Sequence, residues 1–151
     1  MQKLFLTFFG TGLLKPAPGT WGSLAGAIFG VLIFKFIGDQ TLFLASLLLF
    51  LASIKVINDY ESKTGSHDAS HIVIDEVAGV WLAISISGET WMQIALSIIF
   101  FRVLDITKPS IIGRIDKNVK GGLGVMGDDM VAGLFAGLLS AIVYQAINYV
   151  I

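Results

Sequence analysis

The last 22 residues read Met130-Val-Ala-Gly-Leu-Phe-Ala-Gly-Leu-Leu-Ser-Ala-Ile-Val-Tyr-Gln-Ala-Ile-Asn-Tyr-Val-Ile151, and they contain no charged side chain. A helix of this length rises about 33 Å, which is enough to cross the roughly 30 Å hydrocarbon core of a bilayer. The stretch lacks the period-two alternation of a barrel strand, and only helices or closed barrels satisfy their backbone groups in lipid. It therefore predicts a membrane-spanning helix.

Four more apolar blocks precede this one. They run from about Trp21 to Ile37, from Thr41 to Ile57, from Ile72 to Ser87 and from Thr90 to Leu104. Hydrophobic residues make up 55% of the 151-residue chain and charged residues 14%, well below the roughly 25% charged residues of a soluble domain. We therefore predict one all-α integral-membrane domain over residues 1–151, a helical bundle of about four to five apolar helices. A further run, Leu4 to Leu14, is too short to span and is interpreted as interfacial or re-entrant.

Composition also excludes several kinds of protein. The formal net charge is −1, so the chain lacks the basic excess of a nucleic-acid-binding domain. It contains no cysteine, which excludes disulfides, thiolate metal sites and phosphatases with a cysteine nucleophile.

The connections between the blocks differ in length and polarity. Gly38–Gln40 and Gly88–Glu89 are short, whereas Gly10–Thr20, Asn58–His71 and Asp105–Asp129 are longer and polar. If each block crosses the bilayer once, the three long segments share one side, and nine of the ten Lys and Arg residues then lie on that side. The positive-inside rule places this side in the cytoplasm.

Acidic residues gather on the same side and form two adjacent pairs. Asp75-Glu76 and Asp128-Asp129 each stand at or near the start of an apolar block. Capping of the helix N-terminus is one explanation for an acid at such a position. Two adjacent acids, twice, at membrane depth are better explained by a metal or catalytic role, because each costs roughly 2.5–3.5 kcal/mol near the bilayer centre.

The residue types favour a hard cation. Magnesium prefers oxygen ligands and commonly bridges to phosphate, whereas zinc sites usually need more nitrogen or sulfur than His67 and His71 offer. A solvated loop histidine is the alternative for both residues. His67 is the better candidate for an acid–base role, because it stands beside Asp68.

Asp105 and Lys108 are three residues apart at the end of an apolar block, and Pro109 discourages further helix. On one helical turn they could hold a metal and a phosphate together. The alternative is a salt bridge at the end of the helix, with a lysine that extends toward water.

Glycines mark two further features. The stretch from Lys120 to Asp129 predicts a glycine loop that leads into the last helix and lets backbone N–H groups approach an anion. Gly22, Gly26 and Gly30 form a stripe of small residues, and Gly133 and Gly137 form another. These two stripes predict helix-packing surfaces.

Four segments resemble the phosphatidylglycerophosphatase A family, in the order in which that family has them. They are Gly10-Thr-Gly-Leu-Leu-Lys-Pro-Ala-Pro-Gly-Thr-Trp-Gly-Ser-Leu-Ala25; His67-Asp68 with Ile72-Val-Ile-Asp-Glu-Val-Ala-Gly79; Phe101-Arg-Val-Leu-Asp-Ile-Thr-Lys-Pro109; and Ile115-Asp-Lys-Asn-Val-Lys-Gly-Gly-Leu-Gly-Val-Met-Gly-Asp-Asp-Met-Val-Ala-Gly133. Ile74 and Ile106-Thr107 depart from the family's usual residues, and so does Ala69-Ser70-His71, but no matched acid is lost.

The resemblance implies a Mg²⁺-dependent phosphatase of the bacterial inner membrane. It would hydrolyse phosphatidylglycerophosphate to phosphatidylglycerol during phospholipid biosynthesis. Water activated by the metal would attack the phosphorus, and an aspartyl-phosphate intermediate on one of the acids is the alternative. The acids expected around the metal are Asp75, Glu76, Asp105, Asp128 and Asp129, with Asp68 as a sixth catalytic candidate. The groups expected at the substrate are Lys108, Arg114, Lys120 and His67.

Two other functions remain open at this point. A metal-dependent membrane phosphotransferase acting on another phospholipid would need similar residues, although such enzymes generally space their aspartates along one helix. A cation channel or transporter would place acids on both faces or in mid-span. Nothing in the sequence indicates an oligomeric state.

Overall fold

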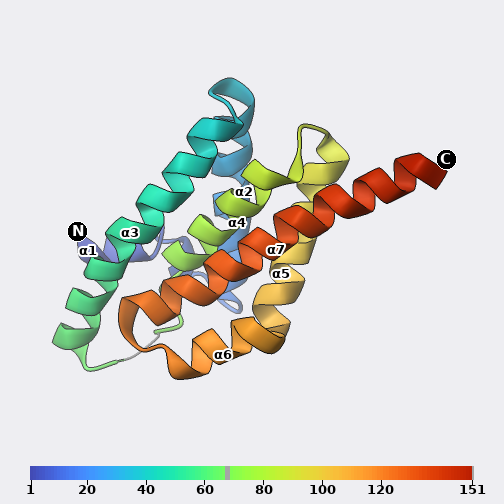
Figure 1. Ribbon diagram of the computed structural model, residues 1–151. Coiled ribbons are helices and arrows are strands. Elements are labelled where there is room, and N and C mark those ends of the chain that lie inside the picture. Colours follow the sequence, from blue (N-terminus) through green and yellow to red (C-terminus); the bar gives the residue numbers. More distant parts are fainter. Residues whose placement is uncertain (67–68, 151) are drawn as a thin grey trace.

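The computed structural model describes residues 1–66 and 69–150 and contains seven α-helices, one short 3-10 helix and no strand in that part of the chain (Figure 1). The elements are α1 (Gln2–Leu6), η1 (Thr11–Leu13), α2 (Pro18–Phe36), α3 (Asp39–Thr64), α4 (Ile74–Ser87), α5 (Trp91–Thr107), α6 (Ser110–Asn118) and α7 (Gly121–Val150). The predicted all-α bundle is confirmed, and each of the five apolar blocks forms a helix.

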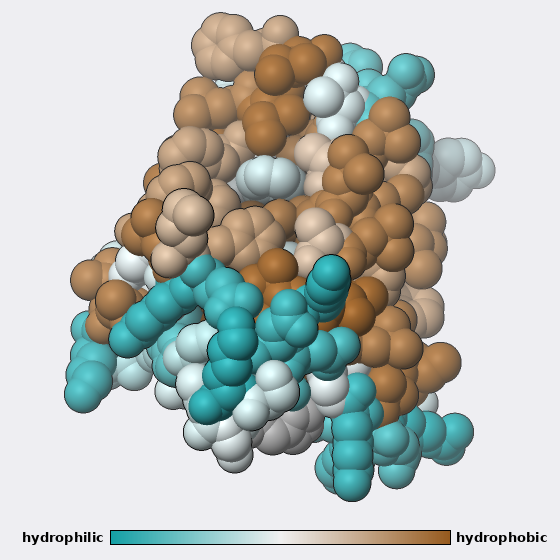
Figure 2. Space-filling model, turned by 90° about the vertical axis from the view of Figure 1, so that its left-hand side faces the viewer, coloured by the Kyte–Doolittle hydropathy of each residue, from teal (hydrophilic) through white to brown (hydrophobic). Residues whose placement is uncertain are grey.

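Three of the helices are long and apolar enough to cross a membrane. These are α2, α3 and α7, with 19, 26 and 30 residues. Their outward-facing side chains are apolar and exposed: Ile28 is 56% exposed, Leu48 is 67% exposed and Ile142 is 63% exposed. Figure 2 shows a broad hydrophobic surface with many hydrophilic side chains at its lower end and a smaller group at its upper right edge. This distribution fits a protein whose helices are surrounded by lipid and whose polar end is in contact with water.

The short helix α4 forms the centre of the bundle. It packs against α2, α3, α5 and α7, and ten of its fourteen residues are buried. Ser46 of α3 donates a hydrogen bond to the backbone oxygen of Ala78 at 2.8 Å. Because α4 is enclosed, apolar residues along its whole circumference are needed, which explains its mostly apolar run from Val77 to Ile86.

The two glycine stripes are packing surfaces, as predicted. On α7, a Cβ at Gly133 would collide with the backbone oxygen of Gly79, and one at Gly137 would lie 2.8 Å from the backbone oxygen of Ala83. The α7 stripe therefore holds two backbones, α4 and α7, in close contact, as small residues commonly do between membrane helices.

The stripe on α2 meets the other side of α4. A Cβ at Gly26 would lie 3.1 Å from the Cα of Val77, and the Trp81 indole nitrogen donates a 2.8 Å hydrogen bond to the Gly26 backbone oxygen. The two stripes thus clamp α4 from two directions.

The glycine stretch before the last apolar block is not a loop, and that prediction is wrong. Helix α7 begins at Gly121, and the N–H of Gly122 donates to the Asn58 side-chain oxygen at 2.7 Å. A Cβ at Gly122 would collide with the backbone oxygen of Ile54. These glycines are present because the start of α7 lies directly against α3, so tertiary contact outweighs their poor helix propensity.

This correction changes the interpretation of the second acidic pair. Asp128 and Asp129 lie about two turns inside α7, beyond the reach of N-terminal capping. Helix α6, nine residues within the predicted polar segment Asp105–Asp129, was also not anticipated.

Replacing Gly133 by Ala should destabilise the bundle. The added Cβ must push α4 and α7 apart, and overpacking of this kind costs roughly 1–3 kcal/mol. Gly127→Ala is a matched control on the same helix, because its Cβ would only make ordinary contact with Ile115 at 3.4 Å. Thermal unfolding in detergent should show a lower midpoint for Gly133→Ala alone. Equal midpoints for the two variants would contradict the close helix contact.

Candidate active site

The three long polar segments meet around one cavity of about 330 Å³ at the lower end of the bundle. The cavity is lined by Pro18, Gly19, Ser70, Ile72, Asp75, Glu76, Asp105, Lys108, Asp116, Val119, Gly124, Val125, Asp128 and Asp129. At the opposite end the two short turns meet, where the Lys35 ammonium donates to the Glu89 backbone oxygen at 3.0 Å. The predicted gathering of the polar segments on one face is therefore present.

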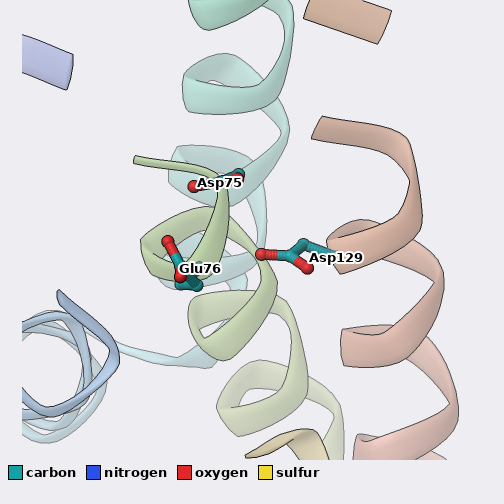
Figure 3. A group of neighbouring side chains, drawn as sticks. All are labelled: Asp75, Glu76 and Asp129. Carbon is teal, nitrogen blue, oxygen red and sulfur yellow. The ribbon is translucent and has the colours of Figure 1, made fainter. Parts of the chain in front are cut away.

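Three carboxylates converge inside the cavity. Asp75 and Glu76 come from the first turn of α4 and Asp129 comes from α7, and one oxygen of each lies within 4.8 Å of the others (Figure 3). We call Asp75, Glu76 and Asp129 the acidic trio. The helices bring them together because Gly79 and Gly133 touch one turn further along α4 and α7.

The acidic trio has oxygens suited to a cation. Within the described chain, Asp75 Oδ1, Glu76 Oε2 and Asp129 Oδ2 are buried and have no hydrogen-bond partner. The N-cap of α4, Val73, makes no side-chain capping hydrogen bond. Several buried carboxylates with unused oxygens are costly by themselves, and a hard cation such as Mg²⁺ would satisfy them. The residues present therefore fit a divalent metal ion.

Asp105 lies beside the acidic trio but is paired with a basic residue. The Arg102 guanidinium, one turn earlier on α5, donates to the Asp105 carboxylate. Arg102 also donates to Ser23 Oγ at 3.0 Å and to Thr20 Oγ1 at 3.2 Å, which connects α5 to the start of α2. Arg102 was not among the predicted site residues, although its position one turn before Asp105 is a signal that could have indicated it.

Lys108 forms a second charged group on the other side of the cavity. It caps the C-terminus of α5 in a left-handed conformation with φ 42°, and its ammonium lies 2.5 Å from Asp116 Oδ1 and 2.7 Å from Asp128 Oδ2. Burial alone would lower the pKa of Lys108, but the hydrogen bonds to Asp116 and Asp128 raise it above its ordinary value. Lys108 is therefore a permanent cation in the cavity wall.

Asp105 and Lys108 both line the cavity, but the alternative of a salt bridge between them at the end of the helix does not form. Asp105 turns to Arg102, and Lys108 turns to the acids of α6 and α7. Sequence reasoning left Asp116 out of the site, because the helix that presents it was not recognised.

The remaining predicted residues lie away from this centre or cannot be placed. Arg114 and Lys120 are exposed and are not among the residues that line the cavity, so their phosphate-binding role stays a prediction. His67 and Asp68 lie outside the described residues. His71 Nε2 is hydrogen-bonded to Tyr60 Oη at 2.8 Å, which ties the segment before α4 to α3.

Membrane-length apolar helices, with an acidic cavity at the polar end and a lysine in its wall, fit the class of membrane enzymes. Comparison with known proteins agrees. The family model described as phosphatidylglycerophosphatase A matches residues 4–144, so the chain belongs to the phosphatidylglycerophosphatase A family.

Individual relatives cover most of the chain. The phosphatidylglycerophosphatase A of Haemophilus influenzae is 38% identical over 93% of this chain and 85% of its own length, and that of Escherichia coli is 38% identical over 87% and 77%. A putative phosphatidylinositol-3-phosphatase of Bacteroides thetaiotaomicron is 35% identical over 94% and 92%. No solved structure matches the chain significantly.

Asp129→Asn should stabilise the protein in EDTA while removing its response to Mg²⁺. The amide keeps the shape of the carboxylate but removes one charge from the crowded acidic trio, and relief of this kind commonly contributes about 0.5–2 kcal/mol. Thermal unfolding in detergent, with EDTA and with Mg²⁺, measures both effects.

The exposed acid Asp59 provides the control for this measurement. Asp59→Asn should leave both midpoints at the wild-type values. If Asp129→Asn kept the full Mg²⁺-induced rise in midpoint, Asp129 would have no part in cation binding.

Proposed function

We propose that this protein hydrolyses the terminal phosphate monoester of phosphatidylglycerophosphate, with Mg²⁺, to give phosphatidylglycerol in phospholipid biosynthesis. The observation that carries the proposal is the acidic trio at the polar end of an otherwise apolar bundle, with Lys108 in the same cavity. Family membership and the names of the two 38% identical relatives support the choice of substrate.

The position of the cavity suits a lipid head group. It is lined mainly by residues of the polar segments, while the helices above carry a broad surface of exposed apolar side chains (Figure 2). A phospholipid has the same division, with acyl chains in the hydrocarbon layer and the phosphate at its edge. The substrate could therefore reach the cavity from the bilayer while its acyl chains remain in lipid.

Each charged group has a distinct task in this proposal. The acidic trio would hold Mg²⁺, and Asp105 would be kept beside it by Arg102. Lys108 would donate a hydrogen bond to a phosphate oxygen of the substrate. When bound, Mg²⁺ supplies positive charge that stabilises the phosphoryl oxygens and lowers the pKa of a bound water. A carboxylate of the cavity would accept the proton that the water loses.

The two alternative functions fit less well. A transporter needs polar groups along a path through the bundle, whereas α4 has no charged residue beyond Glu76 and packs directly on Gly133 and Gly137. A phosphotransferase that takes an alcohol as acceptor remains an outcome of the test below, because it would use the same cation and phosphate groups. The relative named for phosphatidylinositol 3-phosphate makes the head group a second question for experiment.

Location in the bacterial inner membrane, with the cavity in the cytoplasm, is also proposed. Three helices are long enough to cross the membrane, and the cavity end carries most of the basic residues. The positive-inside rule then gives the orientation.

Purified protein in detergent should release inorganic phosphate from phosphatidylglycerophosphate only when Mg²⁺ is present. Asp75→Asn should reduce the rate at least about 100-fold, since a lost cation ligand removes charge stabilisation from the transition state. Asp59→Asn, at an exposed position, should keep the wild-type rate.

Two further arms complete this experiment. Phosphatidylinositol 3-phosphate as substrate tests the head group, and added glycerol as acceptor tests phosphotransfer. Full activity in excess EDTA would overturn the Mg²⁺ requirement. Release from the inositol lipid alone, or transfer to glycerol in place of hydrolysis, would overturn the proposed reaction.

Single cysteines should label from opposite sides of inner-membrane vesicles. Ser66 and Gln40 are exposed at opposite ends of α3, and the chain has no cysteine of its own to interfere. An impermeant thiol reagent should reach Ser66→Cys from the cytoplasmic face and Gln40→Cys only from the other face. Labelling of both from one face would contradict the proposed crossing of α3.

A further inference from the structure

We propose that Lys108 takes the place of a second metal ion in the cavity, and that Asp116 is the positioning residue that, with Asp128, fixes its ammonium for phosphate binding. This inference rests on the proposed function for the identity of its ligand. It assigns a role to Asp116 and predicts that the cavity binds one divalent cation.

The acids of the cavity divide into two groups by their partners. The acidic trio has buried oxygens without a hydrogen-bond partner among the described residues, and so does Asp128 at Oδ1. Only Asp116 and Asp128 contact the Lys108 ammonium, through Asp116 Oδ1 at 2.5 Å and Asp128 Oδ2 at 2.7 Å. The protein itself therefore supplies a cation, the Lys108 ammonium, between the Asp116 and Asp128 carboxylates. A second metal ion would have to displace that ammonium from both acids.

The backbone holds Lys108 in this position. Its φ of 42° is left-handed, a conformation that non-glycine residues rarely adopt, and it ends α5 so that the side chain faces α6 and α7. The side chain of Lys108 is 31% exposed and that of Asp116 is 32% exposed, while that of Asp128 is only 4% exposed. Asp128 is thus a buried anchor, and Asp116 is an anchor at the cavity rim.

The number of N–H donors on the Lys108 ammonium explains how this residue could bind phosphate. A lysine ammonium carries three N–H donors, and two of them are directed to Asp116 and Asp128. The third is left for a group in the cavity, which Lys108 lines together with the acidic trio. A phosphate held by a cation at the acidic trio would find this donor at a fixed place, without the entropy loss of ordering a free lysine.

Cation counting tests the first half of the inference. Titration of the purified protein with Mn²⁺, followed by electron paramagnetic resonance, should give one bound ion for the wild type. Lys108→Met leaves Asp116 and Asp128 without their cation, and the count should rise to two. Lys117→Met, on the exposed face of α6, is the matched control and should give one ion.

Phosphate binding tests the second half. Calorimetry with inorganic phosphate in the presence of Mg²⁺ should show affinity about tenfold weaker for Asp116→Asn, the order expected when one charge-assisted hydrogen bond no longer orients Lys108. Asp116→Glu should restore part of that loss, and the Mn²⁺ count of both variants should remain one. Asp59→Asn should bind phosphate like the wild type.

The outcomes separate this inference from the proposed function. Two Mn²⁺ ions in the wild type, one ion in a folded Lys108→Met variant, or unchanged phosphate affinity in Asp116→Asn would each overturn it. If Lys108→Met does not fold, the wild-type count and the Asp116 variants still decide. None of these measurements uses lipid hydrolysis, so failure to hydrolyse phosphatidylglycerophosphate would overturn the proposed reaction while leaving the cation count intact.

Discussion

The close contact between the α4 and α7 backbones at Gly79 and Gly133 is the constraint on which the rest of the structure depends. In lipid, helices gain little from the hydrophobic effect when they associate, so close packing at small residues is a main source of stability. The same contact fixes the distance between the acidic pairs, which lie one turn before it on each helix. Packing therefore holds together carboxylates that repel one another, and the stability of the apolar part offsets the cost of the polar end.

The polar end balances part of its negative charge with its own cations. Arg102 and Lys108 are each bound to acids of the cavity, and each also joins separate elements: Arg102 connects α5 to α2, and Lys108 connects α5 to α6 and α7. Their ion pairs thus serve the fold as well as the charge balance. The acidic trio is left with buried oxygens that the described residues do not satisfy. Negative charge without a cation partner is therefore concentrated inside the cavity, at the acidic trio, where a cation would bind.

The apolar blocks and the glycine stripes could be recognised from the sequence, because length, hydropathy and small-residue spacing are local properties of membrane helices. The helical start of α7 could not, because Gly121 and Gly122 are poor helix formers and their place in a helix depends on contact with Asn58 and Ile54. The grouping of the acids at one end could be predicted from the number of expected membrane crossings. The partners of these acids could not be predicted, since the contact of Lys108 with Asp128 spans twenty residues and depends on the turn at Pro109.

The cavity exists because α4 is short. Its fourteen residues rise about 21 Å, less than the roughly 30 Å of a bilayer core, whereas its neighbours α3 and α7 have 26 and 30 residues. Its enclosed first turn, with Asp75 and Glu76, therefore begins inside the bundle, short of the polar ends of those helices. The space between this turn and the polar ends is walled by α6 and the segment at Ser70. A full-length central helix would have filled this space with side chains and carried its acids into solvent, where they would be hydrated and would bind a cation less strongly.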